Sequence, residues 1–438
     1  METLINKAPT TNNINKRIPQ TDLTRIVIIG GGFAGIELVR KLGGFNIQII
    51  LIDKHNYHTF IPLLYQVATA GLSPGDISSP LRDFMRDNKH FHFRMAKVQR
   101  VDAINKEIVT DIGTLAYDIL VMASGSRTNF FGNKQLKKSA SNLREITDAI
   151  DLRTKLINNF EDALQVNDES ELEKYMNIVI VGAGPSGVEL AGAICELRKH
   201  ILPKDYPELD FSRMNIILIE GGKQVLGTMS KKAGGKAAKY LRKFAVTLRL
   251  ETILKSYEDG IALLSDGTEI KTNCLIWAAG VQGNLVPGLN EEAALNGRMK
   301  VDEYNLINGH SNIYAVGDVA LQYDDRYPKG LPMLATVAIQ QGSNLAANIG
   351  NTLQGKSLKP FKYLDMGTMA TVGRNKAVID MPFNITIGGF VAWFIWMFIH
   401  LFSIAGFRRK LLVFSNWIWN YVTYSQGNRL IIKKDIDD

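Results

Sequence analysis

One structural unit occurs twice in this chain: a β-branched strand, a glycine-rich turn and a helix. The first copy, RIVIIGGGFAGIELVRKL, has the spacing G-x-G-x-x-G at Gly30, Gly32 and Gly35. The second copy, MNIVIVGAGPSGVELAGAICEL, repeats that spacing at Gly182, Gly184 and Gly187. In such a turn the first glycine permits the tight bend, the second lets a pyrophosphate approach, and the third lets the helix pack on the strand. Two copies about 150 residues apart predict two dinucleotide-binding folds related by internal duplication.

Each copy continues with a second strand that ends in a carboxylate. The segment IQIILID ends at Asp53, and MNIILIE ends at Glu220. A carboxylate at this place accepts hydrogen bonds from ribose hydroxyls. Glu220 would also repel a 2′-phosphate, so we expect the second fold to prefer NADH over NADPH, a preference that the nearby Lys223 would weaken. The proline-containing segment RKHILPKDYPELDFSR explains, as an insertion, why Glu220 lies further than usual from its glycines.

Composition narrows the class of function. The chain has 438 residues, of which 46% are hydrophobic and 21% charged, enough for two or three globular domains. The net charge of +8 fits an anionic membrane surface, and no Lys/Arg-rich tract interleaved with aromatic residues predicts nucleic-acid binding. The two cysteines, Cys195 and Cys274, lie far apart and match no metal-binding or CxxC spacing. We therefore expect two buried thiols, no metal site and a reducing compartment.

Three further apolar segments end in glycine-containing turns. They are VMASGS with Gly125, IWAAGV with Gly280, and NIYAVGDVA, which contains Gly317 and Asp318. Together with the two glycine motifs, these segments resemble the two-dinucleotide-binding-domain flavoproteins. The resemblance implies tightly bound, non-covalent FAD in the first fold, contacted by the glycines, Asp53, Lys54, Gly125 and Asp318. It implies NADH as a substrate in the second fold, contacted by the second set of glycines, Glu220 and Gly280.

The predicted fold class is α/β, with two Rossmann-like domains and a C-terminal membrane-associated helical segment. We expect a disordered lead without a secretory signal over residues 1–24, and an FAD domain over 25–145 and 297–375 that is interrupted by an NADH domain over 146–296. Residues 376–438 would form the membrane-attachment region. Within the NADH domain, EITDAIDLRTKLINNFEDAL predicts an amphipathic helix, and LLSDGTEI predicts a hairpin.

The segment NYHTFIPLLYQVATAGLSP, Asn56–Pro74, makes the resemblance more specific. It resembles the type II NADH:quinone oxidoreductases, the single-subunit NADH dehydrogenases that pump no protons. The segments LATVAIQQGSNLAANI and YLDMGTMATVGRNKAV, and the apolar C-terminus followed by GFRRK, extend the resemblance over nearly everything after residue 24. It implies hydride transfer from NADH to FAD and then transfer of two electrons to a quinone.

The same resemblance implies residues of the quinone site. In the family, the segment that matches residues 335–342 lies against the flavin and lines the quinone tunnel. The residues implied are Ala335, Thr336, Ala338, Gln340 and Gln341, with threonine at 336 where many members have glutamine. An alternative for the two glutamines is a helix that simply begins with polar residues.

Glu189 completes the set of predicted catalytic residues, with Gln340 and Gln341. It follows Gly187-Val188, in what we expect to be the first turn of the second copy's helix, and matches an acid that faces the nicotinamide–flavin junction in the family. The alternative is a carboxylate stabilised by the helix dipole. Lys376 resembles a position near the flavin, with a solvated lysine as its alternative.

The stretch ITIGGFVAWFIWMFIHLFSIAGFRRK, residues 385–410, is long enough to span a bilayer. Gly388-Gly389, His400 and Gly406 interrupt it, and LLVFSNWIWNYVTY follows with tryptophans suited to the headgroup level. We therefore expect a pair of helices in the interface, with the basic residues 408–410 near anionic lipid. A buried core helix is the alternative. The predicted location is the cytoplasmic face of the inner (plasma) membrane, as a peripheral, monotopic protein.

Two other functions remain open from the sequence. One is a soluble NADH-dependent flavin reductase that passes electrons to a protein or to oxygen, and the other is a redox sensor that binds both nucleotides without turnover. The predicted partners are the membrane lipid surface and a quinone, with no nucleic acid, and a homodimer is compatible with the sequence.

Overall fold

The computed structural model describes residues 14–86, 88–289 and 294–431. It divides into two compact units. The first contains the residues up to His58, Ser79–Arg127 and Val281–Leu364, and the second contains Thr59–Ser78, Thr128–Gly280 and the residues from Asp365 onward. Most of the predicted lead lies outside the described residues, and the predicted domain boundaries stay a prediction.

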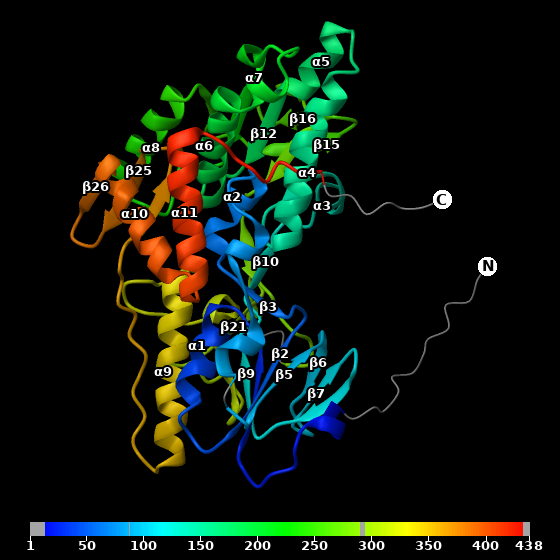
Figure 1. Ribbon diagram of the computed structural model, residues 1–438. Helices are drawn as coiled ribbons and strands as arrows, with labels where there is room; N and C mark the ends of the chain where they lie inside the picture. Colours follow the sequence, from blue (N-terminus) through cyan, green and yellow to red (C-terminus); the bar gives the residue numbers. More distant parts are fainter. Residues whose placement is uncertain (1–13, 87, 290–293, 432–438) are drawn as a thin grey trace. The chain divides into compact units, whose positions relative to one another are not determined.

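The first unit is built on a parallel five-stranded sheet in the order β22-β9-β1-β2-β5. Its strands are β1 (Arg25–Ile29), β2 (Gln48–Asp53), β5 (Phe91–Met95), β9 (Ile119–Met122) and β22 (Ile313–Ala315). Ile26 and Ile28 face a core shared with helix α1 (Phe33–Leu42) and helix α9 (Ala335–Leu353). These two helices lie side by side (Figure 1). The buried β-branched run therefore forms the central strand that leads into the first glycine turn.

The opposite face of this sheet has its own core. Val27 and Ile29 pack there with residues of an antiparallel sheet of β6 (Val98–Asp102), β7 (Glu107–Thr110) and β8 (Gly113–Ala116). The short strands β20 (Ala294–Leu295), β21 (Arg298–Lys300) and β23 (Ala320–Leu321) form a further small sheet. Because successive side chains of a strand point to opposite faces, β1 is buried on both sides.

The second unit repeats this plan with the strand order β11-β18-β12-β13-β14, again all parallel. The strands are β11 (Ser141–Asn142), β12 (Asn177–Val181), β13 (Asn215–Ile219), β14 (Val246–Arg249) and β18 (Cys274–Trp277). Its helices include α4 (Ile146–Ala163), α6 (Pro185–His200) and α8 (Lys231–Lys243). The predicted amphipathic helix is confirmed as α4. The predicted hairpin is confirmed by β16 (Ile261–Leu264) and β17 (Glu269–Lys271), which pair with β15 (Leu254–Glu258).

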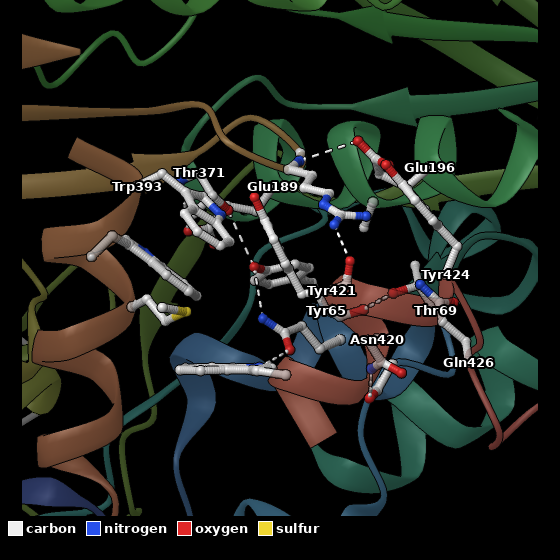
Figure 2. A pocket seen from close by; sticks show the side chains of 18 of the residues that line it. Tyr65, Thr69, Glu189, Glu196, Thr371, Trp393, Asn420, Tyr421, Tyr424 and Gln426 are labelled. Carbon is white, nitrogen blue, oxygen red and sulfur yellow. Dashed lines mark hydrogen bonds between the residues drawn. The ribbon is translucent and has the colours of Figure 1, made fainter. Parts of the chain in front are cut away.

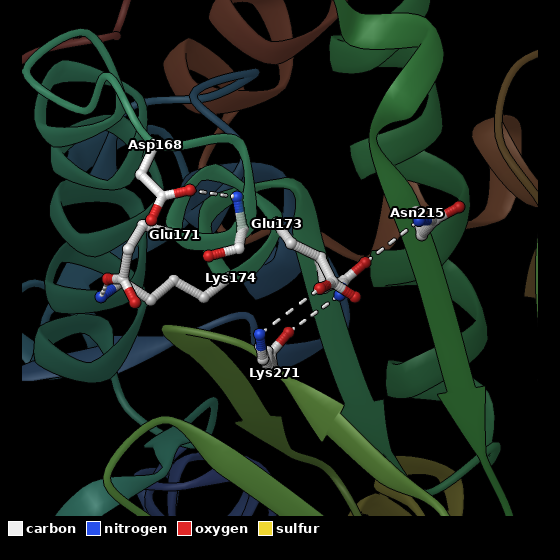
Figure 3. A network of polar contacts seen from close by, with 8 residues as sticks. Asp168, Glu171, Glu173, Lys174, Asn215 and Lys271 are labelled. Atoms are coloured by element: carbon white, nitrogen blue, oxygen red, sulfur yellow. Dashed lines mark hydrogen bonds and ion pairs between the residues drawn. The ribbon is translucent and has the colours of Figure 1, made fainter.

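Polar side chains hold the start of β12 against its neighbours (Figure 3). Asn177 Nδ2 donates to the carbonyl of Lys271 at 2.8 Å, and Asn215 Nδ2 donates to Asn177 Oδ1 at 3.1 Å. Lys271 Nζ lies 3.9 Å from a carboxylate oxygen of Glu173 on helix α5 (Glu169–Met176). These contacts fix the register of the strand that carries the second glycine turn.

The C-terminal part of the second unit begins with an antiparallel sheet and continues with two helices. The strands are β24 (Thr368–Thr371), β25 (Ala377–Met381) and β26 (Ile385–Gly389), followed by α10 (Phe390–Ser403) and α11 (Phe407–Thr423). The expectation that residues 385–389 belong to the helical segment is therefore wrong, because they pair with β25. Gly389 has φ +81°, a left-handed conformation that allows the chain to turn directly from the strand into α10.

Both C-terminal helices expose apolar side chains. Only Ala392 and Trp396 of α10, and only Val413 of α11, are buried. The exposed apolar side chains include Phe394, Phe398, Phe402, Phe407, Leu411, Ile418, Trp419 and Val422. The alternative of a buried core helix is therefore wrong. Among the residues that the structure describes, no helix is both long and apolar enough to cross a membrane.

Candidate nucleotide and acceptor sites

The first glycine turn leaves space where a ligand would approach. Gly30 has φ +110° and donates its N–H to Ile52, and a Cβ there would lie 2.2 Å from the carbonyl oxygen of Ala123. A Cβ at Gly35 would lie 1.9 Å from the carbonyl oxygen of Gly30, so the helix start can pack on the turn only with glycine. A Cβ at Gly32 would meet nothing within 4 Å. The protein itself does not require glycine at 32, which fits the approach of a pyrophosphate.

The second turn reproduces this geometry in the second unit. Gly182 has φ +103° and donates to Ile219 at 2.7 Å, and a Cβ at Gly187 would lie 1.9 Å from the carbonyl oxygen of Gly182. A Cβ at Gly184 would again meet nothing within 4 Å. The prediction of two dinucleotide folds is confirmed by this repetition.

The carboxylate at the end of each second strand binds the turn beside it. Asp53 Oδ2 accepts from the N–H of Gly31 at 2.6 Å, and Glu220 Oε2 accepts from the N–H of Ala183 at 2.8 Å. Glu220 Oε1 also accepts from the N–H of Gly222 at 2.7 Å. Each carboxylate is thus held by backbone donors at the mouth of its turn and retains lone pairs for a ribose.

His58 belongs to the first turn, although the sequence interpretation did not single it out. Its Nδ1 lies 3.0 Å from the carbonyl oxygen of Gly31, which can only accept, so Nδ1 carries the proton. Burial lowers the pKa of His58, which keeps the ring neutral. Asp53 and His58 therefore hold the two ends of the same residue, one at its N–H and one at its carbonyl.

The remaining predicted FAD residues lie in the first unit. Gly125 has φ +69°, and a Cβ there would meet nothing within 4 Å. Ser126 Oγ donates to Asp318 Oδ2 at 2.5 Å, which joins the start of β10 (Ser126–Thr128) to the short 3-10 helix Gly317–Val319 that follows β22. The side chain of Lys54 is exposed. In the second unit, Gly280 has φ +146° and lies in the turn that follows β18.

The predicted quinone residues occupy the start of α9, which begins at Ala335. Gln341 is 1% exposed and accepts from the N–H of Gly317 through Oε1, while its Nε2 donates to Gln322. Gln340 bonds both backbone groups of Leu364.

The other members of this set pack within the first unit. Thr336 Oγ1 lies 3.1 Å from Tyr363 Oη, and Ala338 packs beside Gly317. The alternative of a helix that begins with polar residues is wrong, because Ala335 precedes both glutamines by more than a turn. The role of this segment in quinone binding stays a prediction.

Glu189 lines an apolar cavity of about 400 Å³ in the second unit (Figure 2). The residues that line it include Tyr65, Gln66, Thr69, Thr371, Phe390, Trp393, Phe394, Trp396, Trp417 and Tyr421. These side chains come from helix α2 (Leu64–Ala68) and its following turn, from α6 and β24, and from α10 and α11. The cavity therefore lies between the NADH-type fold and the two exposed apolar helices.

The expected position of Glu189 in the first turn of its helix is wrong, and its place at the nicotinamide–flavin junction stays a prediction. Helix α6 begins at Pro185, so Glu189 lies beyond the first turn, which contains no acidic residue. Its side chain is 7% exposed, and Oε1 accepts from the N–H of Thr371 at 3.4 Å. Burial raises the pKa of Glu189 to about 8, against the opposing effects of the Thr371 amide and the Trp396 indole. The alternative of a carboxylate stabilised by the dipole in the first helical turn therefore does not hold, because Glu189 lies beyond that turn.

A row of hydrogen bonds in the cavity wall was not foreseen. Trp417 Nε1 donates to Gln66 Oε1 at 2.8 Å, and Gln66 Nε2 donates to Tyr65 Oη at 3.0 Å. Tyr65 Oη lies 3.1 Å from Thr371 Oγ1. Burial, together with the nearby Glu189, raises the pKa of Tyr65, so its hydroxyl stays protonated. Tyr65 and Thr371 fall within the quoted family segments, but no sequence signal joins them.

The two cysteines and Lys376 all lie in the second unit. Cys195 and Cys274 are both buried and unpaired, and burial raises the pKa of Cys195 to about 12 and that of Cys274 to about 11. The prediction of two buried thiols is confirmed. Lys376 Nζ lies over the ring of Phe244, 4.0 Å from its centroid.

Comparisons with known proteins agree with this arrangement. Residues 24–342 match the family model described as pyridine nucleotide-disulphide oxidoreductase, and residues 366–423 match the NDH2 C-terminal domain. The type II NADH:quinone oxidoreductase Ndh of Mycobacterium tuberculosis is 33% identical, over 93% of this chain and 90% of that protein. The mitochondrial internal alternative NAD(P)H-ubiquinone oxidoreductase A1 of Arabidopsis thaliana is 27% identical, over 91% of this chain and 84% of that protein.

Solved structures share the fold. NDH2 from Plasmodium falciparum in complex with NADH superposes with a TM-score of 0.85 at 20% identity, covering 94% of this chain and all of that one. The sulfide:quinone oxidoreductase of Aquifex aeolicus gives a TM-score of 0.69 at 19% identity, covering 94% and 96% of the two chains. The family is shown by the match at 33% identity over nearly the whole length of both proteins. This chain belongs to the type II NADH:quinone oxidoreductases, within the pyridine nucleotide-disulphide oxidoreductase family.

Proposed function

We propose that this protein oxidises NADH and reduces a membrane quinone through tightly bound, non-covalent FAD, without pumping protons. The observation that carries the proposal is the pair of glycine turns, each with open space at its second glycine and a carboxylate at its mouth. When bound, FAD accepts a hydride from NADH and returns two electrons to the quinone. The protein supplies binding, orientation and exclusion of water.

The first fold would hold FAD and the second would hold NADH. In the first unit, the N–H groups at the start of α1 would face the pyrophosphate of FAD, and Asp53 would bind the ribose. Asp318 and Gly125 would contact the rest of the FAD molecule. In the second unit, Glu220 would bind the ribose of NADH and disfavour a 2′-phosphate. The assignment of these residues rests on the repeated geometry and on the family.

The electron acceptor is not a thiol of this chain. A disulphide reductase needs two neighbouring cysteines that can be oxidised and reduced. Here Cys195 lies on α6 and Cys274 on β18, and both are buried with raised pKa values. An apolar cavity under two helices with apolar outer faces suits a lipid-soluble acceptor instead.

The outer faces of α10 and α11 would bind the lipid surface as a monotopic attachment, on the cytoplasmic face of the plasma membrane. Phe398, Phe402 and Trp419 are 55%, 58% and 63% exposed, and a basic cluster at residues 408–410 lies at the start of α11. Apolar side chains would enter the headgroup boundary while the basic side chains meet anionic lipid. A homodimer is the second proposed assembly, and sedimentation in detergent at twice the chain mass of 48.7 kDa would support it.

Two experiments test the function. The purified protein should be yellow, should bleach with NADH and should regain its colour when a quinone is added. If NADH bleaches the flavin and no quinone restores the colour, the acceptor is of another class, as in the flavin-reductase alternative. Negligible steady-state turnover with a soluble quinone would favour the redox-sensor alternative.

The lipid attachment is tested with the triple variant Phe398→Ser, Phe402→Ser, Trp419→Ser. It should lose binding to anionic vesicles while NADH still reduces its flavin, because all three side chains lie on the outer faces. Ile104→Ser is the matched control, since Ile104 is 93% exposed on the hairpin of the first unit. A truncation before Ile385 is less informative, because it also removes β26 from its sheet. Unchanged vesicle binding of the triple variant would refute the attachment.

A further inference from the structure

In the row of hydrogen bonds from Trp417 to Thr371, each side chain donates to the next one along the row. It begins on α11, passes through two side chains of α2 and ends on β24, beside the cavity (Figure 2). An indole N–H can only donate, so the Gln66 oxygen must face Trp417. The Gln66 amide nitrogen must then face Tyr65, and since an amide N–H also only donates, the Tyr65 oxygen accepts.

The direction continues to Thr371. The hydroxyl proton of Tyr65 needs its own acceptor, because Tyr65 is 8% exposed. Its other neighbour in this row is Thr371 Oγ1 at 3.1 Å, so Tyr65 donates to Thr371. The Thr371 hydroxyl thus accepts from Tyr65, and its own proton has no acceptor among the residues that the structure describes. Thr371 is 3% exposed and lines the apolar cavity.

We propose that the Thr371 hydroxyl donates a hydrogen bond to a carbonyl oxygen of the quinone head group bound in this cavity. Trp417, Gln66 and Tyr65 are positioning residues, because their hydrogen bonds keep the proton of the Thr371 hydroxyl directed into the cavity. The inference rests on the proposed function, because it takes the quinone as the occupant of the cavity. It adds a substrate-contacting residue outside the α9 segment, and it makes a helix with an apolar outer face part of the acceptor site.

The charge of the cavity wall agrees with a carbonyl ligand. Glu189 lines the same cavity, and because its pKa is raised to about 8 it is mostly protonated at neutral pH. A neutral acid would not repel a carbonyl oxygen as a carboxylate would. A donor aimed in advance at that oxygen becomes more effective as the oxygen gains negative charge during reduction.

The first test compares Thr371→Val with Thr371→Ser in the full-length holoenzyme, with a soluble quinone and NADH. Valine has the shape of threonine without the hydroxyl, so kcat/KM for the quinone should fall about 3- to 10-fold. The rate of flavin reduction by NADH, measured without quinone, should stay unchanged. Serine keeps the hydroxyl and should restore the quinone reaction. Equal quinone kinetics in the wild type and Thr371→Val would overturn the proposal.

The second test uses Trp417→Phe, which keeps an aromatic ring and removes the N–H. The Gln66 amide can then rotate and accept from Tyr65, and Thr371 can turn its proton inward to Tyr65. The quinone step should slow although Trp417 does not touch Thr371, and adding Thr371→Val should slow it no further. Trp393→Phe is the matched control, since Trp393 lines the same cavity but its indole makes no hydrogen bond within the described part of the chain.

The outcomes distinguish a failure of the proposed function from a failure of the positioning row. If the wild type reduces no quinone after NADH has bleached its flavin, the proposed function fails. If the wild type reduces quinone and Trp417→Phe behaves as Trp393→Phe does, only the positioning row fails. Should Thr371→Val not fold, the tryptophan pair still decides, because neither substitution leaves a buried hydroxyl without a partner.

Discussion

The replacement Glu189→Gln should change how the stability of the protein depends on pH. The folded-state pKa of Glu189, about 8, lies above its ordinary value of 4.5. The contribution of Glu189 to the free energy of unfolding is therefore fully present below pH 4.5 and is lost as the pH rises through 8. The reason is that the folded state must either keep a proton that the unfolded state releases or bury a charge. The difference between 4.5 and about 8 corresponds to about 5 kcal/mol in the free energy of unfolding, at 1.36 kcal/mol per pKa unit. Glutamine stays neutral and avoids this loss.

The assay is urea unfolding in detergent at pH 5, 6, 7, 8 and 9, followed by tryptophan fluorescence. All five tryptophans of the chain lie in the second unit with Glu189, so the signal reports on the correct part of the molecule. The variant should gain stability over the wild type by about 1.4 kcal/mol per pH unit between pH 5 and 8, and the difference should then level off.

Glu173→Gln is the control for this experiment. The Glu173 side chain is 55% exposed, and its ion pair with Lys271 lies at the surface (Figure 3). Surface pairs of this kind contribute about 0–1 kcal/mol, so this variant should differ little from the wild type at any pH. If the stability difference between Glu189→Gln and the wild type is the same at pH 5 and pH 9, Glu189 is not a buried acid with a raised pKa.

Three further outcomes follow from the two glycine turns. Gly35→Ala should yield protein without flavin, measured by absorbance at 450 nm, because its Cβ would lie 1.9 Å from the Gly30 carbonyl oxygen. Gly187→Ala should retain flavin and lose its reduction by NADH, because the same clash occurs in the second turn; retention of NADH affinity in this variant would contradict the assignment of the nucleotides. Glu220→Ala should lower the ratio of kcat/KM for NADH to that for NADPH by about tenfold, and an unchanged ratio would remove Glu220 from the selectivity argument.

Features that depend on neighbouring residues could be predicted from the sequence. The glycine turns, their strands and the following carboxylates are read from local spacing, because φ angles and the packing of a helix start on its own turn involve few residues. The exposure of the C-terminal helices could likewise be predicted from their apolar composition. The placement of Glu189 in the first turn of α6 was a local error, because that helix begins at Pro185 and its first turn ends before Glu189.

The structure was needed wherever distant residues meet. An apolar run suits a strand as well as a helix, and only pairing with β25 makes residues 385–389 a strand. Glu189 owes its raised pKa to burial, and the backbone N–H that it accepts from belongs to Thr371, 182 positions away.

The hydrogen bonds of the cavity wall also join residues that lie far apart in the sequence. Tyr65 and Thr371 are separated by 306 positions, and Gln66 and Trp417 by 351. The sequence determined by itself that two nucleotides can bind, because each turn is a local structure. Only the tertiary structure decided which side chains surround the candidate acceptor cavity, because burial and the direction of a hydrogen bond depend on what the rest of the chain places beside each group.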